Sequence, residues 1–161
     1  ALVNLAGAPG EPPAIAVLDR PSARDLEVDT RCMVSPDLPE QACGVVFRYV
    51  DAKNYYLSRV DAVAGDVSLS VVVQGREQPL VRARATVRPS VWQDLRVRAV
   101  ADRFIVEWNG RRVIDVPDVS LGAAGGVGLW ARASCVAYFD ELEVRPLAAR
   151  LHPDDLLPSL L

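Results

Sequence analysis

The chain has 161 residues, of which 50% are hydrophobic and 24% charged, and its formal net charge is −3. This length is typical of one domain with a substantial buried core. The mild negative charge and the lack of a basic cluster exclude a nucleic-acid-binding surface. No run of about 18 apolar residues occurs, so we expect no membrane-spanning helix.

The first residues, ALVNLAGAPGEPP, resemble neither a full signal peptide nor a folded element. We therefore expect an irregular N-terminal segment over residues 1–13, which fits the remnant of a processed N-terminus.

From residue 14 to residue 145, apolar and polar residues alternate almost without interruption. A period of two predicts half-buried strands rather than helices. We expect about eleven short strands, a number typical of β-sandwiches. They lie near residues 14–19, 25–35, 42–50, 54–62, 66–74, 79–87, 92–100, 103–109, 111–116, 125–132 and 135–145.

Turn residues separate these strands, and the clearest of them is the pair Asn109-Gly110. A type I′ hairpin turn needs positive φ at both central residues, and asparagine and glycine tolerate it. Tight turns between many short strands predict an all-β fold, a two-sheet antiparallel sandwich over residues 14–145.

Residues 146–161, PLAARLHPDDLLPSLL, break the alternation and form a C-terminal tail. Pro153 and the two aspartates after it favour the first turn of a short helix, which Pro158 would end. The leucines of this tail are expected to pack on the sandwich or on a neighbouring molecule. A structural or interaction domain that docks onto a partner or a second copy through the tail is therefore one open interpretation.

The stretch GVVFRYVDAKNYYLSRVD, residues 44–61, is predicted to be a hairpin that turns at residues 51–54. Alternation along its two strands then puts Arg48, Tyr55 and Arg59 on one side of the sheet. Phe47, Tyr49 and Tyr56 are expected on the other side.

Trp130 is predicted to face away from the aliphatic core. It alternates with Val127 and Leu129, which are the expected core residues of that strand. Arg132 lies two positions further along and therefore shares the side of Trp130.

Taken in chain order, the predicted strands and the motifs within them resemble the concanavalin A-like lectin/glucanase superfamily. The resemblance is closer to the laminin-G-like jelly rolls near the bacterial 3-keto-disaccharide hydrolase domain family. The resemblance covers roughly residues 25–145 and is carried by RYVDAKNYYLSR, VWQDLRV, WNG, GVGLW and YFDELEV. It implies a jelly roll with one curved sheet, whose exposed side holds sugars. It also implies an extracellular or periplasmic location.

A sugar ring has apolar C–H faces and a belt of hydroxyl groups, so a sugar site needs aromatic surface and planar donors. The co-facial residues supply both. We therefore predict a lectin-like module that binds a carbohydrate on its concave sheet without catalysis. The predicted ligand-binding residues are Arg48, Tyr55, Arg59, Trp130 and Arg132.

Two other interpretations stay open for these residues and for the chain. Arg48 and Arg59 can instead be cross-strand neighbours that cover apolar surface and pair with Asp51 or Asp61. The resemblance also admits a glycoside hydrolase, which needs two carboxyl groups across the scissile bond. The ExDxxE strand motif of the superfamily's glucanases is absent, and the only histidine, His152, lies in the tail.

We predict no required cofactor, with calcium as the open alternative, because related jelly rolls bind calcium through loop oxygens. Five aspartates in or beside predicted turns are individual candidates for calcium ligands, but the sequence does not predict that they lie close together: Asp37, Asp51, Asp66, Asp118 and Asp140. Cys32 and Cys43 flank the loop SPDLPE, so either a cross-strand disulfide or three free thiols, with Cys135, fits the sequence.

Overall fold

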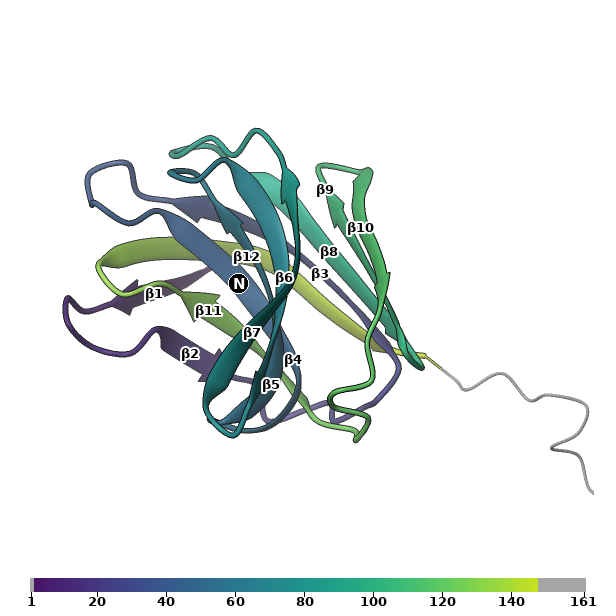
Figure 1. Cartoon of the computed structure of the whole chain (residues 1–161). Coiled ribbons are helices and arrows are strands. Elements are labelled where there is room, and N and C mark those ends of the chain that lie inside the picture. The colour runs from purple at the N-terminus through teal and green to yellow at the C-terminus, as the bar shows by residue number, and fades with distance from the viewer. Residues whose placement is uncertain (1, 148–161) are drawn as a thin grey trace, which may run out of the picture.

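The computed structural model describes residues 2–147, which form two six-stranded antiparallel sheets packed face to face (Figure 1). The first sheet contains β1 (Val3–Gly7), β3 (Leu26–Val34), β8 (Gln93–Val100), β9 (Arg103–Trp108), β10 (Arg111–Pro117) and β12 (Cys135–Pro146). The second contains β2 (Ala14–Val17), β4 (Ala42–Asp51), β5 (Asn54–Asp61), β6 (Asp66–Val73), β7 (Arg76–Arg84) and β11 (Gly126–Ala131).

The strand order is β1-β12-β3-β8-β9-β10 in the first sheet and β2-β11-β4-β5-β6-β7 in the second. The predicted two-sheet antiparallel sandwich is confirmed. At one side of the sandwich the edge strands β1 and β2 lie next to each other (Figure 1). No helix occurs in residues 2–147, so this part of the chain has none that could cross a membrane.

The predicted irregular segment, residues 1–13, contains a strand that the sequence analysis missed. β1 pairs with β12 from Val3, opposite Phe139, to Gly7, opposite Cys135. Its five residues are too few to establish a period of two, and the strand forms because the edge of β12 offers unpaired backbone groups. The short helix predicted around Pro153 lies outside the described residues.

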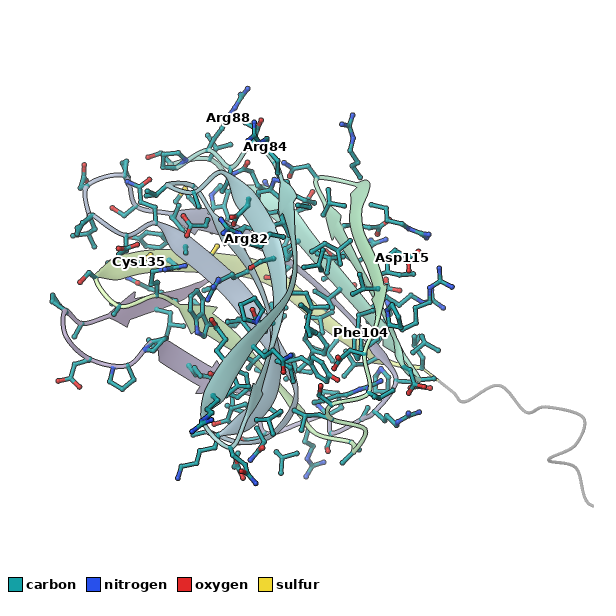
Figure 2. The ribbon with its side chains drawn as sticks, in the orientation of Figure 1. Arg82, Arg84, Arg88, Phe104, Asp115 and Cys135 are labelled. Atoms are coloured by element: carbon teal, nitrogen blue, oxygen red, sulfur yellow. The ribbon has the colours of Figure 1, made fainter. Side chains whose placement is uncertain are left out.

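The core lies between the sheets. It is built mainly from aliphatic residues at alternate positions along the strands, as the period of two requires. Phe104 of β9 lies between the two layers, among the rings of Phe47 and Tyr56 (Figure 2). The Asn109-Gly110 turn has φ values of 51° and 79°, which confirms the predicted hairpin between β9 and β10.

The three cysteines are buried free thiols, so the structure contains no disulfide between Cys32 and Cys43. Burial and a hydrogen bond with the Cys32 side chain raise the pKa of the Cys43 thiol well above its usual value. Cys135 Sγ donates to the carbonyl of Ala42, 3.4 Å away.

The phenol of Tyr56 fastens the loop after β10 to the second sheet. Its hydroxyl donates to Asp118 Oδ2 at 2.7 Å and accepts from the backbone N–H of Leu121 at 3.1 Å. Burial, together with the hydrogen bond to Asp118, raises the pKa of Tyr56 to about 12.

We expect the free energy of unfolding of Tyr56→Phe to fall less steeply than that of the wild type as pH rises above about 10. An unfolded tyrosine has a pKa near 10, so the folded state holds the phenol proton more tightly than the unfolded state. This contribution, on the order of 2 kcal/mol, is present in full below about pH 10 and is lost as pH rises towards 12.

Urea unfolding at pH 7, 10 and 11.5 measures the effect, with Tyr138→Phe on β12 as the matched control. The control should keep the wild-type pH profile. An equally steep profile in Tyr56→Phe would contradict the assignment.

Candidate functional site

The register of the second sheet arranges its outward side chains in rows that cross the strands. One row contains Trp130, Gly44, Arg59, Ser68 and Arg82, from β11 to β7. The rows on either side contain Ala42, Asp61, Asp66 and Arg84, and Gly128, Val46, Leu57, Ser70 and Pro79. Directly opposed residues in an antiparallel sheet have Cβ atoms about 5 Å apart, so these side chains are in reach of one another.

Trp130 faces outward, yet only 2% of its surface is exposed. Two guanidinium groups cover its ring, that of Arg59 at 5.6 Å and that of Arg132 at 5.9 Å from the centroid. Gly44 stands between Trp130 and Arg59 and has no side chain to separate them. A ligand on this face therefore meets the guanidinium groups before the indole, which holds them by cation–π attraction.

Each of these arginines has a carboxylate partner. Arg59 Nη1 donates to Glu77 Oε1 at 3.1 Å, and Arg132 Nη2 donates to Asp61 Oδ2 at 3.0 Å. The predicted pairing of Arg59 with Asp51 or Asp61 is wrong, because Glu77 of β7 reaches Arg59 across β6. These ion pairs fix the two arginines of the site, whose side chains are 20% exposed for Arg59 and 31% exposed for Arg132.

Tyr55 lies on the same outer face and stacks on Tyr49, with ring centroids 5.5 Å apart. Burial, and next the charge of Glu77, raise the pKa of the Tyr55 hydroxyl. Tyr55, Trp130, Arg59 and Arg132 all line one hollow of about 350 Å³. The structure thus brings four of the five predicted ligand-binding residues together.

Arg48 does not belong to this face, so the prediction that it shares a side with Tyr55 and Arg59 is wrong. Its side chain is 1% exposed and points between the sheets, where its guanidinium lies 4.9 Å from the ring of Phe104. It donates to three backbone carbonyls, of Arg24 at 2.9 Å, Leu121 at 3.2 Å and Ala101 at 2.7 Å.

An irregularity in β4 causes this reversal. The pairing with β5 shifts between Phe47 and Asp51, so that β4 contributes more residues than β5 over the same length. Arg48 has φ of 47°, the left-handed region, which is typical of a bulge. Simple alternation fails there, Arg48 turns inward, and Tyr49 takes the outward position.

Sequence reasoning also missed a second hollow on this face, beside the first. It has a volume of about 260 Å³, and its lining includes Ser68 and Ser70 of β6. The alternation in DVSLSVVV puts both serines on the side of Asp66, which is the signal that could have identified them. The other lining residues are Arg59, Asp61, Ala64, Asp66, Pro79, Arg82 and Arg132.

Solved structures of known proteins share this architecture. The carbohydrate-binding module CBM66 from Bacillus subtilis superposes with a TM-score of 0.80 at 21% identity, covering 89% of this chain and 94% of its own. The VIP36 exoplasmic/lumenal domain, in its Ca²⁺/Man3GlcNAc-bound form, gives a TM-score of 0.66 at 19% identity, with coverages of 91% and 79%. The chain has the concanavalin A-like jelly-roll fold.

A GH43 protein from Bacillus licheniformis also contains this jelly roll, with a TM-score of 0.64 at 12% identity. The match covers 91% of this chain and 33% of that protein, so the present chain spans about a third of its length. No protein-family model and no curated protein matches the sequence.

Two carboxylates lie side by side on the outer face of the jelly roll. Asp61 and Asp66 are cross-strand partners at the turn from β5 to β6, and both line the smaller hollow. Retaining glycosidases place two carboxyl groups about 5 Å apart, but one of the two must deliver a proton. Here both carboxylates face arginines instead: Asp61 is ion-paired with Arg132 and Asp66 with Arg82.

The described part of the jelly roll has no group of three histidine, cysteine, aspartate or glutamate side chains placed to hold a metal ion. Two of the candidate aspartates hold local structure. Asp51 accepts from the N–H of Lys53 at 2.8 Å, and Asp118 binds Tyr56 and the N–H of Ser120.

The outer face of the first sheet carries another hollow, of about 600 Å³. Its side chains are mostly charged and mutually paired; Arg96 Nη2, for example, donates to Asp29 Oδ2 at 2.8 Å. No aromatic residue lines it. Because a sugar site combines aromatic surface with planar donors, the outer face of the second sheet is the better candidate.

Proposed function

We propose that this jelly roll binds a carbohydrate ligand reversibly on the outer face of its second sheet, through Tyr55, Arg59, Trp130 and Arg132, and without catalysis. The observation that carries the proposal is the placement of two guanidinium groups over one outward tryptophan. A fold shared with a carbohydrate-binding module and with a lectin domain bound to Man3GlcNAc supports it.

The chemistry of the site suits a ligand rich in hydroxyl groups. A guanidinium has five N–H donors in one plane, and the contact with Glu77 uses one of those on Arg59. The remaining donors are aligned by the indole and by the ion pairs, so little rotamer entropy is lost when a sugar binds. Tyr55 and Tyr49 add an aromatic wall beside them.

The site binds without catalysis in this proposal, because a retaining glycosidase needs two reactive carboxyl groups and Asp61, the neighbour of Asp66, is ion-paired with Arg132. The proposed location is extracellular or periplasmic, where such a module meets polysaccharides. The self-association predicted through the leucine-rich tail concerns residues 148–161, which lie outside the described residues.

A glycan array with the wild type and with Arg59→Ala tests the proposal. We expect the substitution to weaken binding about 10-fold to 100-fold, since a hydrogen bond from a charged donor contributes about 1.5–3 kcal/mol. Trp130→Ala should have a similar effect, because both guanidinium groups lose their support.

Arg111→Ala is the matched control, since this exposed arginine lies on β10 in the other sheet. It should bind as the wild type does, and thermal melts will verify that all variants are folded. A wild type that binds no glycan would refute the proposed function. Binding that survives both Arg59→Ala and Trp130→Ala would remove these residues from the site.

A further inference from the structure

Two serine hydroxyls under the outer surface of β6 have no hydrogen-bond partner among the described residues. Ser68 is 4% exposed and Ser70 is 1% exposed, and the Oγ atoms of both are unpaired. A buried hydroxyl without a partner lowers stability, so proteins rarely keep one without a reason. Both serines line the hollow of about 260 Å³.

Ion pairs cover the two hydroxyls. Arg59 lies opposite Ser68, and its partner Glu77 lies opposite Val72, so this pair passes over β6 between them, where Ser70 lies. On the other side, Arg82 stands opposite Ser68 and donates from Nε to Asp66 Oδ2 at 2.8 Å. The Arg82 side chain is 66% exposed, so it has room to move towards solvent.

A third unpaired polar atom belongs to the same hollow. Arg132 Nε is buried without a hydrogen bond, and Glu40 Oε2, at 3.8 Å, is too far away to accept one. A guanidinium N–H is a donor, whereas each serine hydroxyl can donate and accept. The hollow therefore lacks a partner of mixed donor and acceptor character, and a hydroxyl group has that character.

Carboxylates outnumber arginines around the hollow. Arg59, Arg82 and Arg132 pair with Glu77, Asp66 and Asp61 respectively, and Glu40 is a second carboxylate beside Arg132. An acidic ligand would therefore meet an excess of negative charge. A volume of about 260 Å³ lies just below the range of drug-sized ligand pockets, which begins at about 300 Å³, and suits a single ring.

We propose that this hollow is a subsite for one neutral sugar unit, whose hydroxyl groups complete the hydrogen bonds of Ser68, Ser70 and Arg132 Nε. The inference rests on the proposed function and adds residues and a ligand class to it. The ligand displaces the exposed Arg82 side chain to reach the serines, while Arg59, shared by both hollows, contacts the adjoining unit.

The test uses Ser68→Ala, Ser70→Ala and the double variant, with Ser58→Ala as the matched control. Ser58 carries another buried hydroxyl without a partner, but it lies opposite the core residues Val45 and Leu69 and therefore faces the core. All three single substitutions remove an unpaired hydroxyl, and only Ser58→Ala leaves the hollow unchanged. None should lower the melting temperature.

Binding is measured on a panel of neutral hexose and pentose oligosaccharides and of uronic acid oligosaccharides. We expect the wild type to bind neutral members, Ser58→Ala to match it, and the double variant to bind at least 10-fold more weakly. If the double variant binds as the wild type does while Arg59→Ala does not, the subsite is refuted and the proposed function stands.

Three other outcomes would contradict part or all of this inference. A preference of the wild type for uronic acid members would overturn the neutral ligand class. A melting temperature lowered by several degrees in Ser68→Ala or Ser70→Ala would show that the hydroxyl has a partner, which contradicts the inference. A wild type that binds no member of the panel refutes the proposed function, and the subsite with it.

Discussion

Arg48→Ala is expected to lower the free energy of unfolding by about 3–5 kcal/mol, because it removes the hydrogen bonds of a buried charged donor and its ion pair with Asp25 Oδ1, 3.7 Å away. The guanidinium joins three loops that are distant in sequence, through the carbonyls of Arg24, Ala101 and Leu121. Removing it leaves these acceptors without their charged donor and opens a cavity against Phe104.

Lysine will not substitute for this arginine. Three carbonyls in three directions require the planar fork of a guanidinium, whereas a lysine presents one compact ammonium group. Burial lowers the pKa of the Arg48 guanidinium, and the charge of Arg24 adds to this effect, so the position already disfavours a cation. An ammonium with fewer hydrogen bonds would be disfavoured further.

Urea unfolding of Arg48→Ala, Arg48→Lys and the exposed control Arg111→Ala measures these effects. The control should change the free energy of unfolding by no more than about 0.5 kcal/mol. If Arg48→Ala costs as little as Arg111→Ala, the three carbonyl contacts do not stabilise the fold as described.

Arg48 also shows where prediction from the sequence stops. Alternation assigned the outward direction correctly for Tyr55, Arg59 and Trp130, because each lies in a stretch of regular pairing. It failed for Arg48 and Tyr49, where β4 bulges. The segment FRYVDAKN does not predict the bulge, since the carbonyls that accept hydrogen bonds from Arg48 belong to loops far away in the sequence.

The ion pairs of the site could not be predicted from the sequence for a similar reason. The partner of Arg59 depends on the register between β6 and β7, which shifts between Leu69 and Ser70. A shift of this kind decides whether Glu77 or another residue of β7 can reach Arg59, and it depends on tertiary packing. The serines of β6, by contrast, follow simple alternation and were predictable.

Gly44 is the position on which the geometry of the candidate site depends most directly. It lies between Trp130 and Arg59 in the same row, and a Cβ atom added there would be 2.3 Å from the carbonyl oxygen of Ser58. It would also lie 2.9 Å from the Cα of Arg59. Both neighbours are backbone atoms of β5, so relief requires β5 to move away from β4.

Gly44→Ala should therefore lower the free energy of unfolding by about 1–3 kcal/mol, the usual cost of overpacking. It should also abolish glycan binding in protein that is still folded, because the shift of β5 carries Arg59 away from the indole of Trp130. Urea unfolding measures the first effect, and the glycan array measures the second.

Gly126→Ala on β11 separates this steric effect from a general intolerance of glycine replacement. A Cβ atom at Gly126 would meet nothing nearer than Val17 Cγ1 at 3.5 Å, an ordinary contact. Alanine there should be neutral or stabilise the protein by up to about 1 kcal/mol through the unfolded state, and glycan binding should persist. Equal losses in the two variants would mean that strand separation at Gly44, and hence the spacing of Arg59 and Trp130, does not control binding.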